Sequence, residues 1–292
     1  MGIDLNRTAY PNASGLTVRS SHNTIRDNTI SGVASGIIIG DPLEAPTGTE
    51  YLTNWVTDNR IGPGPDGVNA VQYGNGFNGV VLGAGAREQW IGPGNVISGN
   101  ASVGVLLQHS TTSGNVVFGN QIGPSGDGTV RIGNGIGVAI AGGAHGNAIG
   151  GSWGGNEISG NSIVGVSLGL DGAGPAVSNW VVGNIIGLNA TQTESLGTQM
   201  IGVAMSNDSY YNAVQSNAIA GHTQHGVCLW NAPANAVDSN FIGMSGYGVP
   251  IANGGYGLCF INSANDWARG NAFGANDWGN LYQFNSPGLT LQ

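Results

Sequence analysis

The stretch Gly104-Val105-Leu106-Leu107 decides the fold of this chain, because the same phrase recurs along its whole length. The phrase is a glycine followed by an aliphatic residue, a variable residue and a second aliphatic residue. Its ten copies begin at Gly15, Gly36, Gly79, Gly104, Gly137, Gly165, Gly202, Gly226, Gly257 and Gly288. Such spacing is typical of a solenoid, in which one coil is built again and again. We therefore expect one repeat domain over residues 15–292, after an N-terminal stub or cap at residues 1–14.

Each coil is predicted to contain three short strands. In the coil that begins at Gly202, Val203 and Met205 alternate with a smaller residue, which is the period of a strand with one buried face. Short apolar runs at 212–214 and 217–219 follow, separated by turn residues. No helical period is present. The sequence therefore predicts an all-β parallel β-helix of nine to ten coils.

Equivalent inward positions of successive coils should form three apolar columns, because each strand pairs with its counterpart one coil on. The first column is Leu16, Ile37, Val80, Val105, Val138, Val166, Val203, Val227 and Leu258. The second is Ile25, Val56, Ile91, Val117, Ile149, Val181, Val214, Val237 and Trp267. The third is Ile30, Ile61, Ile97, Ile122, Ile158, Ile186, Ile219, Ile242 and Phe273. Together they predict a continuous core.

Asparagine occupies one bend in nine successive coils. These residues are Asn28, Asn59, Asn95, Asn120, Asn156, Asn184, Asn217, Asn240 and Asn271. An inward asparagine can satisfy the backbone groups of a buried bend, and its amide can bond to the asparagine one coil away. We interpret this column as scaffold rather than as a binding site.

The intervals between the phrases alternate between short and long. In the long coils the extra residues follow the third strand, as in 62–67 and 123–128, so these loops should project from one corner at every second coil. The insertion at 41–51 differs, because it follows a first strand.

Composition narrows the functional classes. Charged residues make up 8% of the chain, lysine is absent, and the net charge is −9. The sequence lacks the stripe of basic residues that binding to a nucleic-acid backbone or an anionic membrane requires, which disfavours both partners. No apolar run is long enough to span a membrane. Met1-Gly2-Ile3-Asp4 does not begin a signal peptide, yet the polar, weakly charged composition suits an extracellular or cell-surface protein.

The chain resembles the right-handed parallel β-helix, or pectin-lyase-like, superfamily. More narrowly, it is similar to bacterial β-helix repeat proteins whose coils alternate NxISGN with NxIG. The matching stretches are 95–100, 156–161 and 120–135. The resemblance covers roughly residues 15 to 290 and implies the right hand of the helix. It also implies work on extracellular polysaccharides, by hydrolases, lyases, epimerases, phage tailspikes or adhesins without chemistry.

The better-known catalytic motifs of that superfamily are missing. The chain lacks the polygalacturonase-type set of Asn-Thr-Asp, Asp-Asp, Gly-His-Gly and Arg-Ile-Lys, and the epimerase-type Asp-Pro-His. Without lysine it has no lysine base for a lyase reaction. Since a fold does not grant an activity, whether the protein is an enzyme stays open at this point.

Two carboxylates are the first catalytic candidates. Asp27 and Asp58 each precede a bend asparagine in adjacent coils, which would place them roughly 5 Å apart. Arg26 and Arg60 are their neighbours in the sequence. Paired carboxylates at that separation suit a retaining glycosidase. The alternatives are ordinary turn chemistry neutralised by the arginines, or a site for a cation such as calcium.

Aromatic residues are the second candidate. Trp55, Trp90 and Trp180 share one outward strand position, and Phe118 lies on the neighbouring outward position. Flat rings in such a row hold sugars, although they can equally pack beneath a loop or a neighbouring subunit. In the first case Glu44 and Glu50 of the insertion become further acid candidates.

The histidines and cysteines carry little signal. The histidines His22, His109, His145, His222 and His225 are scattered without metal-binding spacing, and we expect turn histidines to be solvated. Cys228 and Cys259 repeat one position in consecutive coils, where a disulfide would be strained. We predict no cofactor, apart from the calcium alternative.

The variable position of the repeated phrase faces outward and is apolar. Its residues include Ile38, Val81, Leu106, Ala139, Ala204, Cys228 and Cys259. A flat apolar face predicts self-association, and the strand at the C-terminal end of the sequence predicts end-to-end assembly.

Two functional hypotheses follow. The leading one is an extracellular β-helix that binds or processes a polysaccharide along the strand that carries Trp55, Trp90 and Asp58, as a glycoside hydrolase if it is catalytic. The competing one is a structural or adhesive β-helix without chemistry that self-associates. Bridging of the two aspartates by arginine would favour the second. The sequence does not name the glycan.

Overall fold

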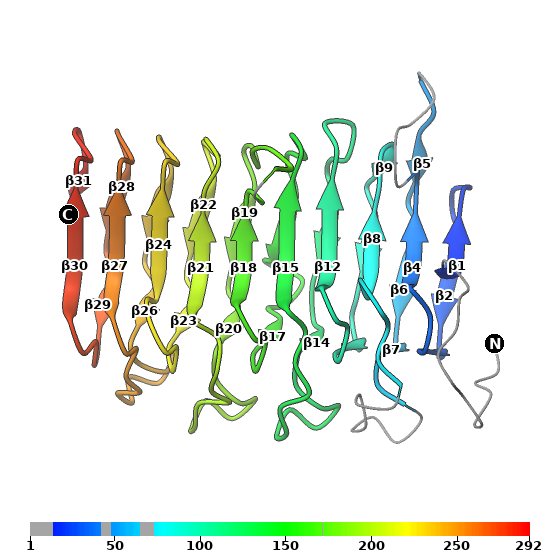
Figure 1. Ribbon diagram of the computed structural model, residues 1–292, viewed down its shortest axis with the longest axis horizontal. Coiled ribbons are helices and arrows are strands. Elements are labelled where there is room, and N and C mark those ends of the chain that lie inside the picture. Colours follow the sequence, from blue (N-terminus) through cyan, green and yellow to red (C-terminus); the bar gives the residue numbers. More distant parts are fainter. Residues whose placement is uncertain (1–13, 42–47, 65–72, 171) are drawn as a thin grey trace.

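The computed structural model describes residues 14–41, 48–64, 73–170 and 172–292. Over these ranges the chain winds into a right-handed parallel β-helix with three strands per coil (Figure 1). Two ten-stranded sheets and one nine-stranded sheet run along the helix axis. All pairs of successive strands within them are parallel, which confirms the predicted fold. Residues 1–13 of the expected stub lie outside the described residues.

The strands of each sheet are as follows. The first sheet contains β1 (Ser14–Val18), β4 (Ser35–Ile39), β8 (Val80–Leu82), β12 (Val103–Gln108), β15 (Ile136–Ala141), β18 (Val164–Leu168), β21 (Ile201–Met205), β24 (Val227–Trp230), β27 (Tyr256–Ile261) and β30 (Gly279–Phe284). The second contains β2 (Thr24–Arg26), β6 (Trp55–Thr57), β10 (Trp90–Ile91), β13 (Val116–Val117), β16 (Ala148–Gly150), β19 (Trp180–Val182), β22 (Ala213–Gln215), β25 (Ala236–Asp238), β28 (Trp267–Arg269) and β31 (Thr290–Leu291).

The third sheet turns back toward the first. It contains β3 (Thr29–Ile30), β7 (Arg60–Ile61), β11 (Val96–Ile97), β14 (Gln121–Ile122), β17 (Glu157–Ile158), β20 (Ile185–Ile186), β23 (Ala218–Ile219), β26 (Phe241–Ile242) and β29 (Ala272–Phe273). A small separate sheet pairs β5 (Tyr51–Leu52) with β9 (Ala86–Arg87).

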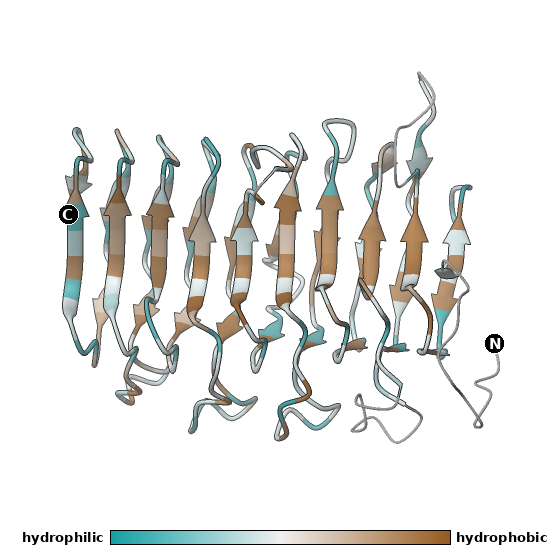
Figure 2. Cartoon of the chain, viewed as in Figure 1, coloured by the Kyte–Doolittle hydropathy of each residue, from teal (hydrophilic) through white to brown (hydrophobic). Residues whose placement is uncertain are grey.

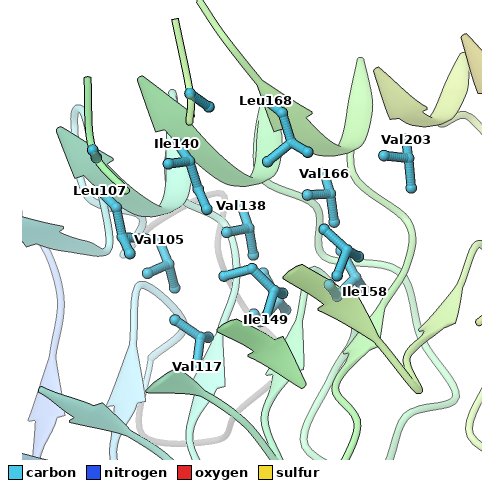
Figure 3. Packing of buried hydrophobic residues seen from close by; sticks show 14 of the residues in the cluster. Val105, Leu107, Val117, Val138, Ile140, Ile149, Ile158, Val166, Leu168 and Val203 are labelled. Carbon is cyan, nitrogen blue, oxygen red and sulfur yellow. The ribbon is translucent and has the colours of Figure 1, made fainter. Parts of the chain in front are cut away.

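The core consists of inward side chains stacked in register. Val105, Val138, Val166 and Val203 follow one another in the first column, facing Val117 and Ile149 of the second sheet and Ile158 of the third (Figure 3). The first and third predicted columns are confirmed by the strand registers. A fourth column is formed by the second aliphatic residue of the repeated phrase, which the sequence placed on the buried face of the strand but which was not counted among the predicted columns; its members are Val18, Ile39, Leu82, Leu107, Ile140, Leu168, Met205, Leu229 and Phe260.

Two assignments near the C-terminal end are wrong. Val237 pairs with Ala268 rather than Trp267, so Ala268 enters the core and the Trp267 side chain faces outward. The segment 288–291 is not a tenth copy of the repeated phrase, because Thr290–Leu291 pairs with β28 in the second sheet. The tenth strand of the first sheet is β30, in which Leu281 pairs with Leu258. A run of alternating apolar residues looks the same in either sheet, which explains the second error. The first is a slip of one residue, at a position where the larger apolar side chain faces outward and the smaller one inward.

Side-chain amides bond to one another along all three corners of the helix. At the predicted bend, the Asn120 amide donates to the side-chain oxygen of Asn156 (3.0 Å) and to the carbonyl of Ile91 (2.8 Å), and the backbone N–H of Asn120 donates to the same Asn156 oxygen. The corner between the first and second sheets carries Asn23, Asn54, Gln89, Asn115, Asn147, Asn179, Asn212, Asn235 and Asp266. The corner between the third and first sheets carries Asn75, Asn100, Asn134, Asn161, Gln199, His222, Asn253 and Asn276.

These columns continue through Gln89 but lose hydrogen bonds at Gln199, His222 and Asp266, where other residues replace asparagine. His222 is 2% exposed, and neither ring nitrogen has a hydrogen-bond partner among the described residues. The expectation of a solvated turn histidine is therefore wrong. Burial lowers the pKa of His222 to about 3, against a weaker opposing effect of the Ile186 carbonyl. Its neighbour Gln199 leaves Nε2 unpaired, and Asp266 leaves Oδ2 unpaired.

The long loops leave one corner at every second coil, as predicted. In Figure 1 the loops after β14, β20 and β26 project on the same side of the helix. Each described one closes as a hairpin, through the antiparallel bridges Pro124–Arg131, Leu188–Ser195 and Met244–Pro250. Short connections alternate with these long loops. In the coils that have a short connection, the chain turns from the third sheet directly into the next strand of the first sheet. The insertion at 41–51 is described only at its ends.

The outer face of the first sheet is apolar but largely covered. Brown predominates on its strands from β4 to β15, whereas β30 carries teal (Figure 2). Val81, Leu106 and Ala139 are buried in a cluster with Val103, and Ile38, Ile136 and Leu170 pack against it. Cys228 and Cys259 lie in register on this face as buried free thiols. Self-association through the face stays a prediction, although little of the apolar surface is exposed.

Among the described residues, no helix has the length and apolarity that a membrane crossing requires.

The amide columns predict large effects from single truncations. Asn156→Ala removes the bonds to Val117 O and Asn184 Oδ1, leaves the backbone N–H of Asn120 without its acceptor, and removes one of the two bonds that the Asn120 side-chain amide donates. We expect a loss of about 3 kcal/mol or more in the free energy of unfolding, since each stranded buried group costs about 1–3 kcal/mol. Urea titration measures it. The control Gln215→Ala removes an exposed amide of β22 and should change stability by less than about 0.5 kcal/mol.

Asp266 should make stability depend on pH. Burial raises its pKa from 3.8 to about 6, opposed by hydrogen bonds from Ser263 and the Asn235 backbone. The folded state therefore favours the protonated acid, and this contribution is present below pH 4 and lost as pH rises through about 6. Asp266→Asn restores an amide donor that does not ionise. The variant should gain stability over the wild type at pH 8 but not at pH 4, and equal gains at both values would contradict this account.

Candidate functional site

Outward side chains of the third sheet form a column along the helix axis, and its polar members all lie in the first five coils. In register order they are Thr29, Arg60, Val96, Gln121, Glu157, Ile185, Ala218, Phe241 and Ala272. Two adjoining cavities follow the first six of these positions, with volumes of 720 and 360 Å³. Gly94 and Gln121 line both cavities, so the two form one elongated groove.

We call this depression the acidic groove. Its residues are Asp27, Asn28, Thr29, Asp58, Asn59, Arg60, Gly94, Asn95, Val96, Gly119, Asn120, Gln121, Ser125, Gly126, Asp127, Gly155, Asn156, Glu157, Gly183, Ile185 and Ala190. One wall is the bend between the second and third sheets. The other contains the hairpin 124–131 and, one long loop further on, Ala190. The predicted candidates Asp27 and Asp58 thus line the same groove as residues from four further coils.

Glu157 is the most perturbed group in the groove. It begins β17 beside Gln121 of the preceding coil, is 7% exposed, and its Oε1 has no hydrogen-bond partner among the described residues. Burial raises its pKa to about 7, the Gln121 amide opposes the rise, and the charge of Asp127 adds to it. Glu157 therefore holds a proton near neutral pH at the edge of an open groove.

Asp127 has the opposite character. Its Oδ1 accepts hydrogen bonds from the Ser125 hydroxyl (2.5 Å), the Thr129 hydroxyl (2.8 Å) and the Thr129 backbone N–H (3.1 Å). These bonds lower the pKa of Asp127 and keep the carboxylate ionised. None of them uses Oδ2. A protonated and an ionised carboxyl group therefore share one groove, which is the usual arrangement of an acid–base pair.

Asp27 and Asp58 are bridged by an arginine. Arg26 Nε lies 3.3 Å from Asp27 Oδ2 and 3.1 Å from Asp58 Oδ2. All three side chains are substantially exposed, so the pair is screened by solvent. The structure brings the two aspartates together as expected, but with a neutralising charge between them. This weakens their assignment as the acid and base. Arg60 lines the groove one coil along.

Two glycines make room for these carboxylates. A Cβ on Gly94, where φ is +81°, would lie 2.3 Å from Asp58 Oδ1. A Cβ on Gly128, where φ is +70°, would lie 2.7 Å from Glu157 Oε2. Any larger residue would push against the groove carboxylates in addition to straining the backbone.

Four tryptophans line one outward position of the second sheet. Strand registers place Trp55, Trp90, Trp180 and Trp267 in a single column. The Trp55 and Trp90 rings stack at 4.9 Å with an interplanar angle of 6°, so each covers one face of the other. Trp153, which is 66% exposed, and the buried Phe118 meet Trp90 edge-on. Trp180 stands without a tryptophan neighbour and is 46% exposed.

The aromatic cluster borders the groove. Trp55 lies three residues before Asp58, and Trp153 lies two residues before Gly155 of the groove wall. The candidates of the two predicted types therefore lie on adjacent faces of one corner.

The remaining predicted residues lie elsewhere. Glu50 forms an ion pair with Arg87 of the next coil, at the corner between the first and second sheets. Glu44 lies outside the described residues. Over the described ranges, no three or more His, Cys, Asp and Glu side chains gather as a metal site would require.

Glu157, Asp127 and Trp153 were missed by the sequence analysis. Glu157 carries a recognisable signal, since it occupies the outward position directly before the third-column isoleucine Ile158. Asp127 and Trp153 lie in glycine-rich connections whose paths the repeat does not define. Their positions required the structure.

Comparisons with known proteins support the fold alone. No family model and no curated protein sequence matches this chain. Among solved structures, a variant of the periplasmic alginate epimerase AlgG is similar with a TM-score of 0.56 at 15% identity, over 91% of this chain and 62% of that one. The A-module of the Azotobacter vinelandii mannuronan C-5 epimerase AlgE4 gives 0.57 at 15% identity, over 94% and 75%. Tailspike protein 2 of bacteriophage CBA120 gives 0.50 at 11% identity, over 87% and 38%.

Two substitutions should move the pKa of Glu157 in opposite directions. Asp127→Asn removes a nearby negative charge and should lower it, whereas Gln121→Leu removes an amide that favours the ionised form and should raise it. NMR of protein labelled with ¹³C at the glutamate carboxyl measures both, with Glu157→Gln to assign the signal among five glutamates. Shifts of the same sign in both variants would contradict the assigned environment.

Proposed function

We propose that this protein binds and cleaves an extracellular polysaccharide in the acidic groove, as a glycoside hydrolase. The observation that carries the proposal is Glu157, a nearly buried carboxyl group with a raised pKa beside an ionised carboxylate. A groove along the helix axis suits a linear polymer, and the alginate and mannuronan epimerases with this fold agree with that use.

The chemistry requires two carboxyl groups in different protonation states. Glu157 donates its proton to the glycosidic oxygen as the bond to the anomeric carbon breaks, and a sugar hydroxyl leaves. Asp127, ionised and with Oδ2 unused by its loop, either attacks the anomeric carbon or takes a proton from the water that does. Addition of water completes the reaction in both routes, and the anomeric configuration of the product distinguishes them.

The tryptophan column supplies the binding surface beside this chemistry. Trp153 and Trp180 present exposed indole rings, and flat apolar rings pack against the C–H faces of sugars. We place the protein outside the cytoplasm or at the cell surface, in keeping with the periplasmic epimerase and the tailspike that share its fold.

A non-catalytic adhesive β-helix is the second candidate. The ion pairs of Arg26 with Asp27 and Asp58 favour it, because they neutralise the carboxylate pair that first suggested catalysis. In that case Glu157 would only contribute to glycan binding.

Product analysis on a panel of plant, algal and bacterial polysaccharides tests the proposal. Wild-type protein should release new reducing ends, and Glu157→Gln should lower the rate at least about 10²-fold, the usual contribution of a general acid. The rate should fall as pH rises through about 7, where Glu157 loses its proton. The matched control Glu88→Gln changes an exposed glutamate at another corner and should leave the rate unchanged. Binding without cleavage by wild-type protein, weakened in Glu157→Gln, would favour the adhesive candidate.

A further inference from the structure

The groove has an excess of acidic groups. Asp27, Asp58, Asp127 and Glu157 line it, and Arg60 is the basic residue among its lining. Arg26 stands beside it with its guanidinium engaged by two of those carboxylates. The chain has no lysine and a net charge of −9, so the wider surface adds no positive field.

This charge pattern disfavours an anionic polymer. A polyuronate or sulfated glycan carries a charge on nearly every residue, and such charges would approach the ionised Asp127, which has no base paired with it among the described residues. Two like charges 4 Å apart repel by about 1 kcal/mol in water and about 4 kcal/mol near a protein surface. Three other arginines, Arg19, Arg87 and Arg269, are paired with carboxylates elsewhere. These three are therefore not free to neutralise such a polymer. Arg131, at the end of the wall hairpin, donates through Nε to the Gly160 carbonyl and adds one positive charge at the edge of the groove.

The same groups suit neutral sugars. Hydroxyl groups need acceptors, and Asp127 offers an Oδ2 that its own loop does not use. The side chain of Gln121 can both donate and accept. Hydrogen bonds from a neutral hydroxyl to a carboxylate are charge-assisted and stronger than neutral ones. The indole of Trp153 binds the apolar face of a pyranose equally well whether or not the sugar is charged.

The groove also has the dimensions of a chain rather than of one sugar. Its lining extends from Thr29 in the first coil to Ile185 in the sixth, which spans about 24 Å at roughly 4.8 Å per coil. Glu157 lies in the fifth of these coils, so several sugar units fit on one side of it. This position suits cleavage within a polymer.

We infer that the acidic groove takes an uncharged polysaccharide and excludes polyuronates and sulfated glycans. The inference rests on the proposed function, since it names the substrate class of the same groove. It separates this chain from the alginate epimerases that share its fold, whose substrate by name is a polyuronate.

Binding of one polysaccharide in its charged form and in its neutral form tests this inference. Polygalacturonate and alginate are compared with the same polymers after reduction of their carboxyl groups to alcohols, alongside an array of neutral and acidic glycans. We expect wild-type protein to bind neutral array members or the reduced polymers at least about tenfold more tightly than the charged forms, from about 1.4 kcal/mol of repulsion. Binding of the neutral polymer should change less than about twofold between 20 and 500 mM NaCl, because no ion pairs form.

Variants check that the groove is responsible. Asp58→Asn with Asp127→Asn removes two negative charges from the lining and should narrow the difference between charged and neutral polymers. The matched pair Asp208→Asn with Asp277→Asn removes two exposed charges that do not line the groove, and it should leave the difference unchanged.

Two results would overturn the inference and leave the proposed function standing. One is tighter binding or faster cleavage of the charged form, with salt weakening it. The other is binding of the charged form that requires Ca²⁺ and is abolished by a chelator. If no polymer of either kind is bound or cleaved, the proposed function itself fails, and this inference fails with it.

Discussion

Every feature of this protein depends on the stacking of like on like along one axis. Three parallel sheets align equivalent residues of successive coils, so each sequence position becomes a column. Aliphatic columns make the core, and amide columns hold the corners together. At one corner the backbone N–H and the side-chain amide of Asn120 both donate to the side-chain oxygen of Asn156. The backbone of a bend cannot pair as a strand does, and the amides satisfy it. The columns tolerate little variation, which is why buried Asp266 and His222 are perturbed.

Function belongs to the outward positions, because they escape this constraint. Between successive coils the outer column of the third sheet changes from Gln121 to Glu157 while its inward partners, Ile122 and Ile158, stay the same. The scaffold holds these side chains at fixed spacing, and the hairpin that carries Asp127 adds a wall. A carboxyl group half enclosed by that wall keeps its proton, whereas one held by loop hydroxyls loses it. Different environments on one rigid surface thus shift the pKa values of two carboxylic acids in opposite directions.

The repeat made most of the fold predictable from sequence. Columns such as Ile97, Ile122 and Ile158 could be aligned by counting from bend asparagines. Counting failed where the pattern itself was ambiguous, at Trp267 and at the final phrase. Counting Gly288 as a tenth copy gives two long coils in succession, which contradicts the alternation of short and long coils in the rest of the chain. The site was less predictable. Asp27 and Asp58 were found because they repeat in register, but Asp127 and Trp153 lie in connections where no repeat constrains the path.

The alternation of short and long coils gives the groove a coarser period than the sheet beneath it. Side chains recur along its floor at roughly 4.8 Å, whereas the hairpins 124–131 and 188–195 rise from its edge at about twice that distance. The edge of the groove therefore consists of separate hairpins with openings between them, rather than a continuous wall. A polymer lying along the groove would contact a hairpin at every other unit of its backbone, and its side branches could leave through the openings between the hairpins. Such a comb would sort polysaccharides by the spacing of their branches.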